Sequence, residues 1–526
     1  MEAAVRQFVE EMAKTFFVAT AIDYTNSAPH IGHAYEKVLA DVLARYHRFK
    51  GEPVFFLTGV DQHGQKVQQS AAKEGVPPAQ FVSTVTQKFL DLWKKLGVEY
   101  DEWAATVEPR HKAVVQGILQ RLYDEGQIYK DKQSGYYSVR QEQFITDKER
   151  GPDGEFGPEW GQVELREEDN YYFKLSQYRD WLLGYLKQRA DAVIPDFRQT
   201  ELHNAVEKLS GDLCISRPKS RLDWGIELPF DAEYVTYVWF DALTNYISFA
   251  GYDPTLSTFN SQPSTFREKW PALQIIGKDI MAPAHGIYWL IMLHALGFPD
   301  EAIPQLLVHG WWNLGGAKMS KSAGNVVDPN ALADKYGPEA LRYYLMSDIA
   351  TGSDADFSEE RLISRYNADL ANSLGNLLNR TLNMAHRYRD GVVTHKGGDS
   401  PLAGQSAELI REFDRAMVAF EVHAAIARLG EFVTACNTYI EMSAPWKMAK
   451  DADRADALDH TLFALAEALR IIAGLISPVL PKASREIFYQ LNIEPTSRLA
   501  DAGWGGLPRQ HKLGKPVPVF PRIEEG

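Results

Sequence analysis

The chain has 526 residues, of which 45% are hydrophobic and 24% are charged. This length predicts about three or four domains, and the composition excludes collagen-like, disordered and low-complexity chains. Lys and Arg total 56 against 70 Asp and Glu, giving a net charge of −14. Residues 361–526 hold 20 basic and 19 acidic side chains. A nucleic acid would therefore meet the least repulsion in this last third of the chain.

Cysteine content and hydropathy limit the compartment in which the chain works. Cys214 and Cys436 are the only cysteines, which excludes a disulfide framework and a multi-cysteine zinc site and indicates a reducing compartment. Residues 1–15 contain charges and no apolar run, so they do not predict a signal peptide. The most apolar stretch, 463–480, contains Glu467 and Arg470, which indicates a buried helix. We expect a cytoplasmic protein that does not bind membranes.

The first elements form a β–α–β unit. An apolar run at 16–22 predicts a buried strand, and helical periodicity over 34–50 stops at Gly51. A second strand at 54–58 precedes a helix that ends near residue 75. In an open α/β sheet, ligands bind beyond the carboxyl ends of the strands, so loops 23–33 and 59–64 are the informative ones. The absence of a G-x-G-x-x-G motif argues against a dinucleotide site.

Later segments predict an interrupted α/β domain followed by helices. Short aromatic runs with Gly and Pro turns suggest a module inserted at 129–230, after which strands resume at 234–240, 273–276 and 306–309. Helical patterns then occupy 361–388, 406–420, 422–442 and 458–476. The predicted fold is a Rossmann-like parallel-sheet domain in two halves (16–128 and 231–330), an inserted module (129–230), a linking region (331–368) and an all-α helical bundle (369–526).

The sequence HIGH at residues 30–33 follows the first strand. Its two imidazoles, three positions apart, point the same way at a helix N-terminus, and Gly32 allows close backbone approach. Unpaired N–H groups and the helix dipole suit a phosphate at such a position. A helix cap with two surface histidines, or half of a metal site, remains an alternative for these four residues alone.

A second motif, KMSKS at residues 318–322, lies between Gly316 and Gly324. Lys318 and Lys321 on a glycine-flanked loop can close over a polyanion and then retract. Alone, such a loop is more typical of a solvated surface turn. The two motifs in this order, on this fold, are far more specific than either one.

The pair of motifs resembles the class I aminoacyl-tRNA synthetases. Five further stretches narrow the resemblance to the methionyl-tRNA synthetase family: AIDY at 21–24, TGVDQHG at 58–64, YVWFDAL at 237–243, IGKDI at 276–280 and APW at 444–446. The resemblance implies that ATP, with Mg²⁺, activates L-methionine to methionyl-adenylate with release of pyrophosphate. Methionine then passes to the terminal adenosine of tRNA(Met), including the initiator tRNA.

The resemblance also assigns residues to ATP. His30 and His33 would contact the α-phosphate, and Lys318 and Lys321 the pyrophosphate. The other predicted ATP contacts are Gly32, Glu36, Gly277 and Asp279. Because the carboxylate of the amino acid is itself the nucleophile, catalysis needs only positioning and charge stabilisation.

For methionine, Asp61 is the candidate for the ammonium group. Aromatic rings suit a thioether sulfur, although an aromatic core stripe is the alternative for residues 234–246. By the resemblance, the pocket comprises Ala21, Ile22, Tyr24, Trp239, Ala242, Tyr246, Ile280 and His285. The stretch from Asp279 to His285 is one residue longer than usual in the family, which makes the His285 assignment less secure.

In the helical domain, Asn376 and Arg380 are four residues apart and share a helix face. The resemblance places both at the anticodon with Trp446. The alternative is that Trp446 fills a gap between helices and Arg380 forms a surface ion pair. By the resemblance, residues 129–230 would serve the acceptor end of tRNA, and 331–368 its stem.

Two departures from the family pattern carry expectations. Residues 135–142 lack the cysteines with which many members bind zinc, so the chain resembles the zinc-free branch and we expect no metal site. No further oligonucleotide-binding domain follows residue 526, so we expect a monomer. Two alternatives remain: another class I synthetase, although those for leucine, isoleucine and valine need a longer editing insertion, or a non-catalytic tRNA-binding relative.

Overall fold

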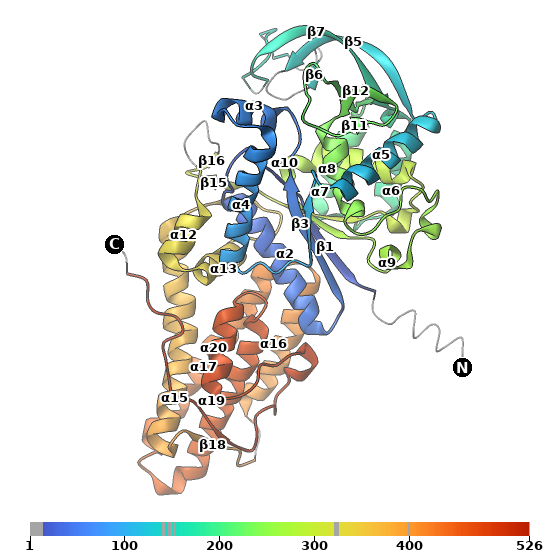
Figure 1. The fold of residues 1–526 in the computed structure, drawn as a ribbon. Helices are drawn as coiled ribbons and strands as arrows, with labels where there is room; N and C mark the ends of the chain where they lie inside the picture. The colour runs from blue at the N-terminus through green and yellow to red at the C-terminus, as the bar shows by residue number, and fades with distance from the viewer. Residues whose placement is uncertain are drawn as a thin grey trace, which may run out of the picture.

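The computed structural model describes residues 14–138, 143–145, 147, 150–151, 153–158, 160–319, 326–397 and 400–524. A parallel sheet with flanking helices forms the upper half of the molecule, and a helical bundle forms the lower half (Figure 1). No helix within these ranges combines the length and apolar character needed to cross a membrane.

The central sheet is wholly parallel. Its strands run in the order β2, β3, β1, β13, β14, β8, with β4 also paired to β3. Helices cover both faces, which is why the strands read as apolar runs. Their bounds are β1 Phe16–Thr20, β2 Asp23–Tyr24, β3 Val54–Asp61, β4 Glu102–Ala105, β8 Val193–Ile194, β13 Leu273–Gly277 and β14 Gln305–His309.

Strand order reverses between β1 and β13. From β1 the chain passes through α2 (Ile31–Lys50) to β3 on one side, whereas β13 leads to β14 on the other. The crevice at this switch point is where doubly wound sheets bind ligands. Gly59 lets β4 approach β3, because a Cβ at this position would lie 2.0 Å from the carbonyl oxygen of Ala104.

Most predicted strands and helices are present, although the helix predicted at 406–420 is Pro401–Val418, and two further differences have a local cause. The helix predicted at 34–50 begins at Ile31, because the side chain of His30 caps it. The strand predicted at 234–240 is wrong beyond residue 236: β12 is Asp231–Thr236, and α8 (Val238–Ser248) follows. The apolar run continues into a helix that is buried on nearly every face, a pattern that cannot be told from a strand by periodicity.

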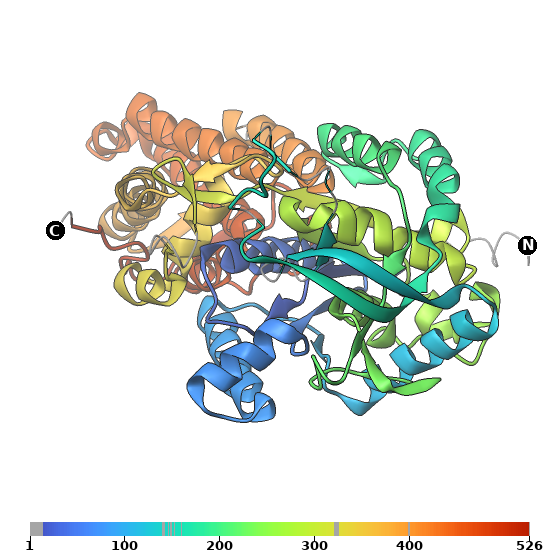
Figure 2. The ribbon, with the colours of Figure 1, turned by 90° about the horizontal axis from the view of Figure 1, so that it is seen from above.

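The segment 129–230 contributes to more than one sheet. Its long ribbon of β5 (Ile128–Ser138) and β7 (Val163–Phe173) passes over the main sheet when seen from above (Figure 2). β6 (Gln143–Ile145) and β9 (Leu213–Cys214) complete that sheet, while β10 (Ser216–Pro218), β11 (Glu227–Leu228) and β12 form another. Within the same segment, β8 joins the main sheet beside β14, flanked by α6 (Arg179–Gln188) and α7 (Asp196–Glu207).

The C-terminal region is a helical bundle built around α19 (Ala455–Ile476), which is almost wholly buried. Its other helices are α14 Glu359–Arg365, α15 Asn376–Arg389, α16 Pro401–Val418, α17 Val422–Ser443, α18 Pro445–Met448 and α20 Pro481–Leu491, with a π-helix at Tyr366–Gly375. α12 (Pro329–Tyr336) and α13 (Pro338–Ser347) connect it to the sheet.

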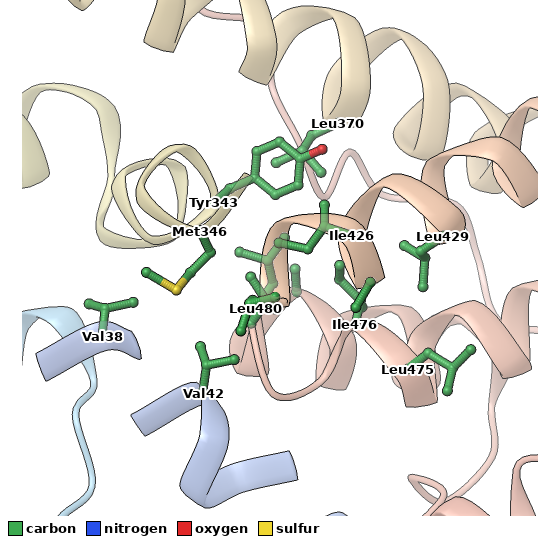
Figure 3. Packing of buried hydrophobic residues seen from close by; sticks show 14 of the residues in the cluster. Val38, Val42, Tyr343, Met346, Leu370, Ile426, Leu429, Leu475, Ile476 and Leu480 are labelled. Atoms are coloured by element: carbon green, nitrogen blue, oxygen red, sulfur yellow. The ribbon is translucent and has the colours of Figure 1, made fainter. Parts of the chain in front are cut away.

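One hydrophobic core runs from the sheet domain into the bundle. Figure 3 shows Val38 and Val42 of α2 in the same cluster as Met346 of α13 and Leu480 after α19. Arg342, buried in α13, pairs with Asp41 of α2 at 2.7 Å and donates to the carbonyls of Pro478 and Val479. The helix that carries the histidine motif is therefore packed directly against the helical bundle.

Candidate active site

A cavity of about 500 Å³ opens at the carboxyl ends of β1, β3, β13 and β14. It lies at the reversal of strand order, where polar loops from distant parts of the sequence converge. Its lining includes the histidine motif, α8 and the π-helix Met281–Trp289. The lining thus combines a polar part with a largely aromatic part.

The two motif histidines are fixed by backbone donors. Nδ1 of His30 accepts from the N–H of Gly32 at 3.1 Å, and Nδ1 of His33 accepts from the N–H of His30 at 3.0 Å. A neutral ring that accepts at Nδ1 carries its proton on Nε2. A Cβ on Gly32 would lie 2.9 Å from the His30 ring, so glycine leaves room for this cap. The rings lie 3.8 Å apart between centroids at the start of α2.

A buried charge network lies beneath this pair. The ammonium of Lys37 contacts Asp23 at 2.6 Å and Glu36 at 2.8 Å, and Glu36 also contacts Nε2 of His309 at 3.1 Å. Burial raises the pKa of Asp23 to about 7. Burial also opposes ionisation of Glu36, but Lys37 and His309 outweigh it and lower its pKa. Asp23 and Glu36 both line the cavity wall, and Lys37 pairs with each of them.

Asp61 is the last residue of β3 and lines the cavity. Its main-chain oxygen accepts from both the N–H and the hydroxyl of Thr25, each at 2.9 Å. One carboxylate oxygen accepts from the N–H of His63 at 3.3 Å. The side chain is therefore held in place on the cavity wall, where a carboxylate can bind a cation.

The aromatic end is formed by one face of α8 and the π-helix opposite. Trp239, Ala242 and Tyr246 are three and four residues apart, so they share that face. The Tyr246 hydroxyl lies 2.8 Å from Nε2 of His285, and Nδ1 of His285 lies 3.0 Å from the carbonyl of Ile280. Since a carbonyl only accepts, Nδ1 donates and Nε2 accepts the tyrosine proton. Burial lowers the pKa of His285 to about 4, although the Glu36 carboxylate acts in the opposite direction, so the His285 ring is neutral.

The cavity gathers residues predicted from four separate stretches of sequence. Around it lie His30, Gly32, His33, Glu36, Gly277, Asp279, Ala21, Ile22, Tyr24, Asp61, Trp239, Ala242, Tyr246, Ile280 and His285. His285 reaches the cavity from the π-helix Met281–Trp289.

The lysine motif is only partly described. β15 (Trp312–Leu314) and β16 (Ala317–Lys318) form a hairpin through Gly315 and Gly316, and Met319 lines the cavity. Lys318 therefore lies in a strand that leads to the cavity. Lys321 lies outside the described residues.

The three residues predicted at the anticodon lie in the helical bundle, far along the chain from the cavity. Asn376 is exposed at the start of α15, and Trp446 is half-buried in α18. Arg380 forms an ion pair with Glu441 of α17 at 2.6 Å. To contact RNA, Arg380 would have to break this ion pair with Glu441.

Several cavity residues received no role in the sequence analysis, although some belong to the motifs quoted there. They are Asp23, Lys66, Tyr237, Val238, Leu243, Asn245, His309, Gly310, Trp311, Trp312 and Met319. Asp23 and His309 had an available signal, because each lies at the carboxyl end of a strand predicted from the sequence. The others come from segments whose position depends on the tertiary fold.

The expectation of no metal site concerns a stretch that is described only to residue 138, so it stays a prediction. Within the described ranges, no group of three His, Cys, Asp or Glu side chains has an arrangement suited to a metal ion.

Comparison with known proteins places this site in a family. Residues 16–153 and 160–382 match the family model described as tRNA synthetases class I (M), and residues 394–526 match the anticodon binding domain of methionyl tRNA ligase. Methionine–tRNA ligases of Bacillus subtilis and Listeria monocytogenes are 40% and 39% identical, over 97% and 98% of this chain and 78% and 79% of theirs.

A solved structure agrees with these matches. The Mycobacterium tuberculosis methionyl-tRNA synthetase in complex with methionyl-adenylate superposes with a TM-score of 0.90 and 36% identity, covering 97% of this chain and 100% of that one. The chain therefore belongs to the class I aminoacyl-tRNA synthetases. Within that class it belongs to the methionyl-tRNA synthetases. The predicted family and the predicted fold class, a Rossmann-like domain followed by a helical anticodon-binding domain, are confirmed.

Proposed function

We propose that this chain activates L-methionine with ATP in the cavity described above and transfers it to tRNA(Met). The observation that carries the proposal is that one cavity is lined both by the histidine motif at the N-terminus of α2 and by the aromatic face of α8. Amino-acid activation needs both surfaces, because the carboxylate of the bound amino acid must meet the α-phosphorus of ATP.

In the first step, a carboxylate oxygen of methionine attacks the α-phosphorus, and the bond to pyrophosphate breaks. The chain supplies no nucleophile, so it acts by alignment and by stabilising charge on the phosphoryl oxygens. Nε2–H groups of His30 and His33 are the proposed donors, since Nδ1 of each ring accepts from the backbone. Lys318 and Lys321 would neutralise the pyrophosphate as it leaves. In the second step, a hydroxyl of the terminal tRNA adenosine attacks the carbonyl of methionyl-adenylate, and AMP leaves.

Methionine itself would be recognised at both of its ends. We assign its ammonium to Asp61 and its thioether to Trp239, Tyr246 and His285. Burial keeps His285 neutral, so its one proton on Nδ1 is donated to the carbonyl of Ile280, and its Nε2 accepts from the hydroxyl of Tyr246. An anionic amino-acid side chain would lose its hydration there and would be repelled by the Glu36 carboxylate, which interacts with both His285 and Tyr246.

The remaining assignments concern metal and assembly. Mg²⁺ would enter with ATP, bound mostly by phosphate and water oxygens. No structural zinc is proposed, because the two cysteines lie in different domains, in β9 and α17. We propose a monomeric cytoplasmic enzyme whose helical bundle reads the anticodon through Asn376, Arg380 and Trp446.

The test is ATP–pyrophosphate exchange by the purified chain with each of the 20 amino acids, without tRNA. We expect exchange with methionine at a kcat/KM at least a hundredfold above that with any other amino acid. Preferred exchange with leucine, isoleucine or valine would identify a different class I synthetase. Exchange with none, from a folded chain, would favour a tRNA-binding relative without catalysis.

A further inference from the structure

Asp241 lies behind the amino-acid end of the cavity without lining it. The residue is in α8, and its exposed fraction is 1%. Oδ2 lies 2.6 Å from Nδ1 of His63, which follows β3, and Oδ1 lies 2.7 Å from Nε2 of His111 in α5 (Pro109–Asp124). One carboxylate therefore joins three elements that meet at this end of the site.

The positions of the protons in this cluster follow from the hydrogen-bond partners of each group. A carboxylate that accepts two imidazole N–H groups is ionised, and although burial raises the pKa of Asp241, His63 and His111 outweigh it and hold the pKa at about 2. His111 has a second partner through its other ring nitrogen, because Nδ1 lies 2.7 Å from the hydroxyl of Ser248. Nε2 of His63 is buried without a hydrogen-bond partner in the described part of the chain. The proton of a neutral His63 therefore belongs on Nδ1, facing Asp241.

The same loop holds Asp61. The N–H of His63 donates to the Asp61 carboxylate at 3.3 Å, and the intervening Gln62 is fixed by Thr106 and Trp224 through its N–H and carbonyl, at 2.9 and 2.6 Å. Asp241 precedes Ala242 on the helix that also presents Trp239 and Tyr246 to the cavity. The carboxylate thus links the loop that carries Asp61 to the helix that carries the aromatic face.

We propose that Asp241 is a positioning residue for the amino-acid substrate. By holding the imidazole of His63, it sets the distance between the Asp61 carboxylate and the aromatic face of α8. Those two surfaces bind the two ends of one amino acid, so the link controls amino-acid affinity and not ATP affinity. The inference rests on the proposed function of the cavity.

The direct test is Asp241→Asn. The amide keeps the size of the side chain but donates from one of its two positions, so one histidine must move its proton to its other nitrogen. For His63 that would create a buried N–H without an acceptor, which is costly, whereas Nδ1 of His111 can donate to the hydroxyl of Ser248, so the amide nitrogen should face His111. His63 then donates to a neutral amide oxygen in place of a carboxylate, which weakens the link between its loop and α8. In pyrophosphate exchange, we expect the KM for methionine to rise tenfold or more, while the KM for ATP and kcat change less than threefold.

Two variants separate positioning from general stability. Asp41→Asn is the matched control, because Asp41 is also fully buried and ion-paired, to Arg45 and Arg342, but lies away from the cavity. It should lower the Tm without changing the KM for methionine. His63→Gln removes the same link from the other side, so it should raise the KM for methionine alone, and the double variant should raise it no further than Asp241→Asn does.

Three results would overturn the proposal. They are an unchanged KM for methionine in Asp241→Asn, an equal rise in the KM values for methionine and ATP, and additive effects in the double variant. If Asp241→Asn fails to fold, His63→Gln alone decides between the same outcomes. Failure of the proposed function would give a different result, because the unmodified chain would then show no methionine-dependent pyrophosphate exchange.

Discussion

Lys37 is fully buried between two carboxylates beneath the histidine pair. One ammonium cannot balance both acids. Glu36 has a second partner in His309, whereas Oδ2 of Asp23 is buried with no hydrogen-bond partner among the described residues. The raised pKa of Asp23, about 7, shows that Asp23 is the acid whose ionisation this packing opposes.

This imbalance predicts a pH-dependent stability difference. Because the folded-state pKa of Asp23 is raised, its contribution to stability is fully present below the unfolded-state pKa, near 4, and is lost as the pH rises through about 7. Asp23→Asn removes this dependence while keeping an oxygen for Lys37. The free energy of unfolding of Asp23→Asn minus that of the unmodified chain should therefore be larger at pH 8 than at pH 5, by on the order of 2 kcal/mol.

Urea unfolding of both proteins at the two pH values measures this change. All other titrating groups are shared, so their effects cancel in the comparison. A difference between the two proteins that is the same at pH 5 and pH 8 would show that Asp23 titrates normally in the folded chain.

At the scale of elements, the sequence predicts strands and helices best where a single local pattern distinguishes one from the other. The strands β1, β3, β13 and β14 are short apolar runs closed by polar loops, and all four are present close to their predicted bounds. The helical start of 238–248 could not be predicted in this way, because its apolar residues suit a buried strand equally well. Only the family resemblance predicted that Asp61, α8 and His285 line one cavity, because no local sequence pattern encodes their proximity.

The break between α17 and α18 is the element on which the proposed tRNA contact depends. α17 ends at Ser443, Ala444 takes a positive φ of 47°, and Trp446 follows half-buried. One part of the indole packs on the helical core, and the rest is exposed. An exposed ring face suits stacking with an unpaired base, as is common in RNA loops.

Trp446→Ala should raise the KM for tRNA in aminoacylation at least tenfold, since base stacking contributes about 1–3 kcal/mol. Exchange without tRNA should be nearly unchanged, because the cavity lies in the other domain. Tyr489→Ala is the matched control, as it truncates an aromatic side chain that is 78% exposed elsewhere in the bundle. If Trp446→Ala melts early and loses both activities together, the indole serves only the core.

At the scale of the whole molecule, the sheet domain and the bundle share one core. Asp41, Arg342 and the carbonyls of Pro478 and Val479 come from three distant parts of the chain. Sequence patterns predicted the order of the domains, but not this junction, because contacts at such separation leave no local periodicity. Its consequence is that α2, which begins at the histidine motif, is supported by the domain proposed to bind the anticodon.

The central claim is that one cavity at the β1–β13 crevice binds methionine through Asp61. The most direct measurement is calorimetric titration of methionine, and separately of ATP, into the unmodified chain and Asp61→Asn. Loss of a charge-assisted hydrogen bond costs about 1.5–3 kcal/mol, so the Kd for methionine should rise tenfold to a hundredfold while the Kd for ATP stays within twofold. An unchanged Kd for methionine in Asp61→Asn would contradict the account.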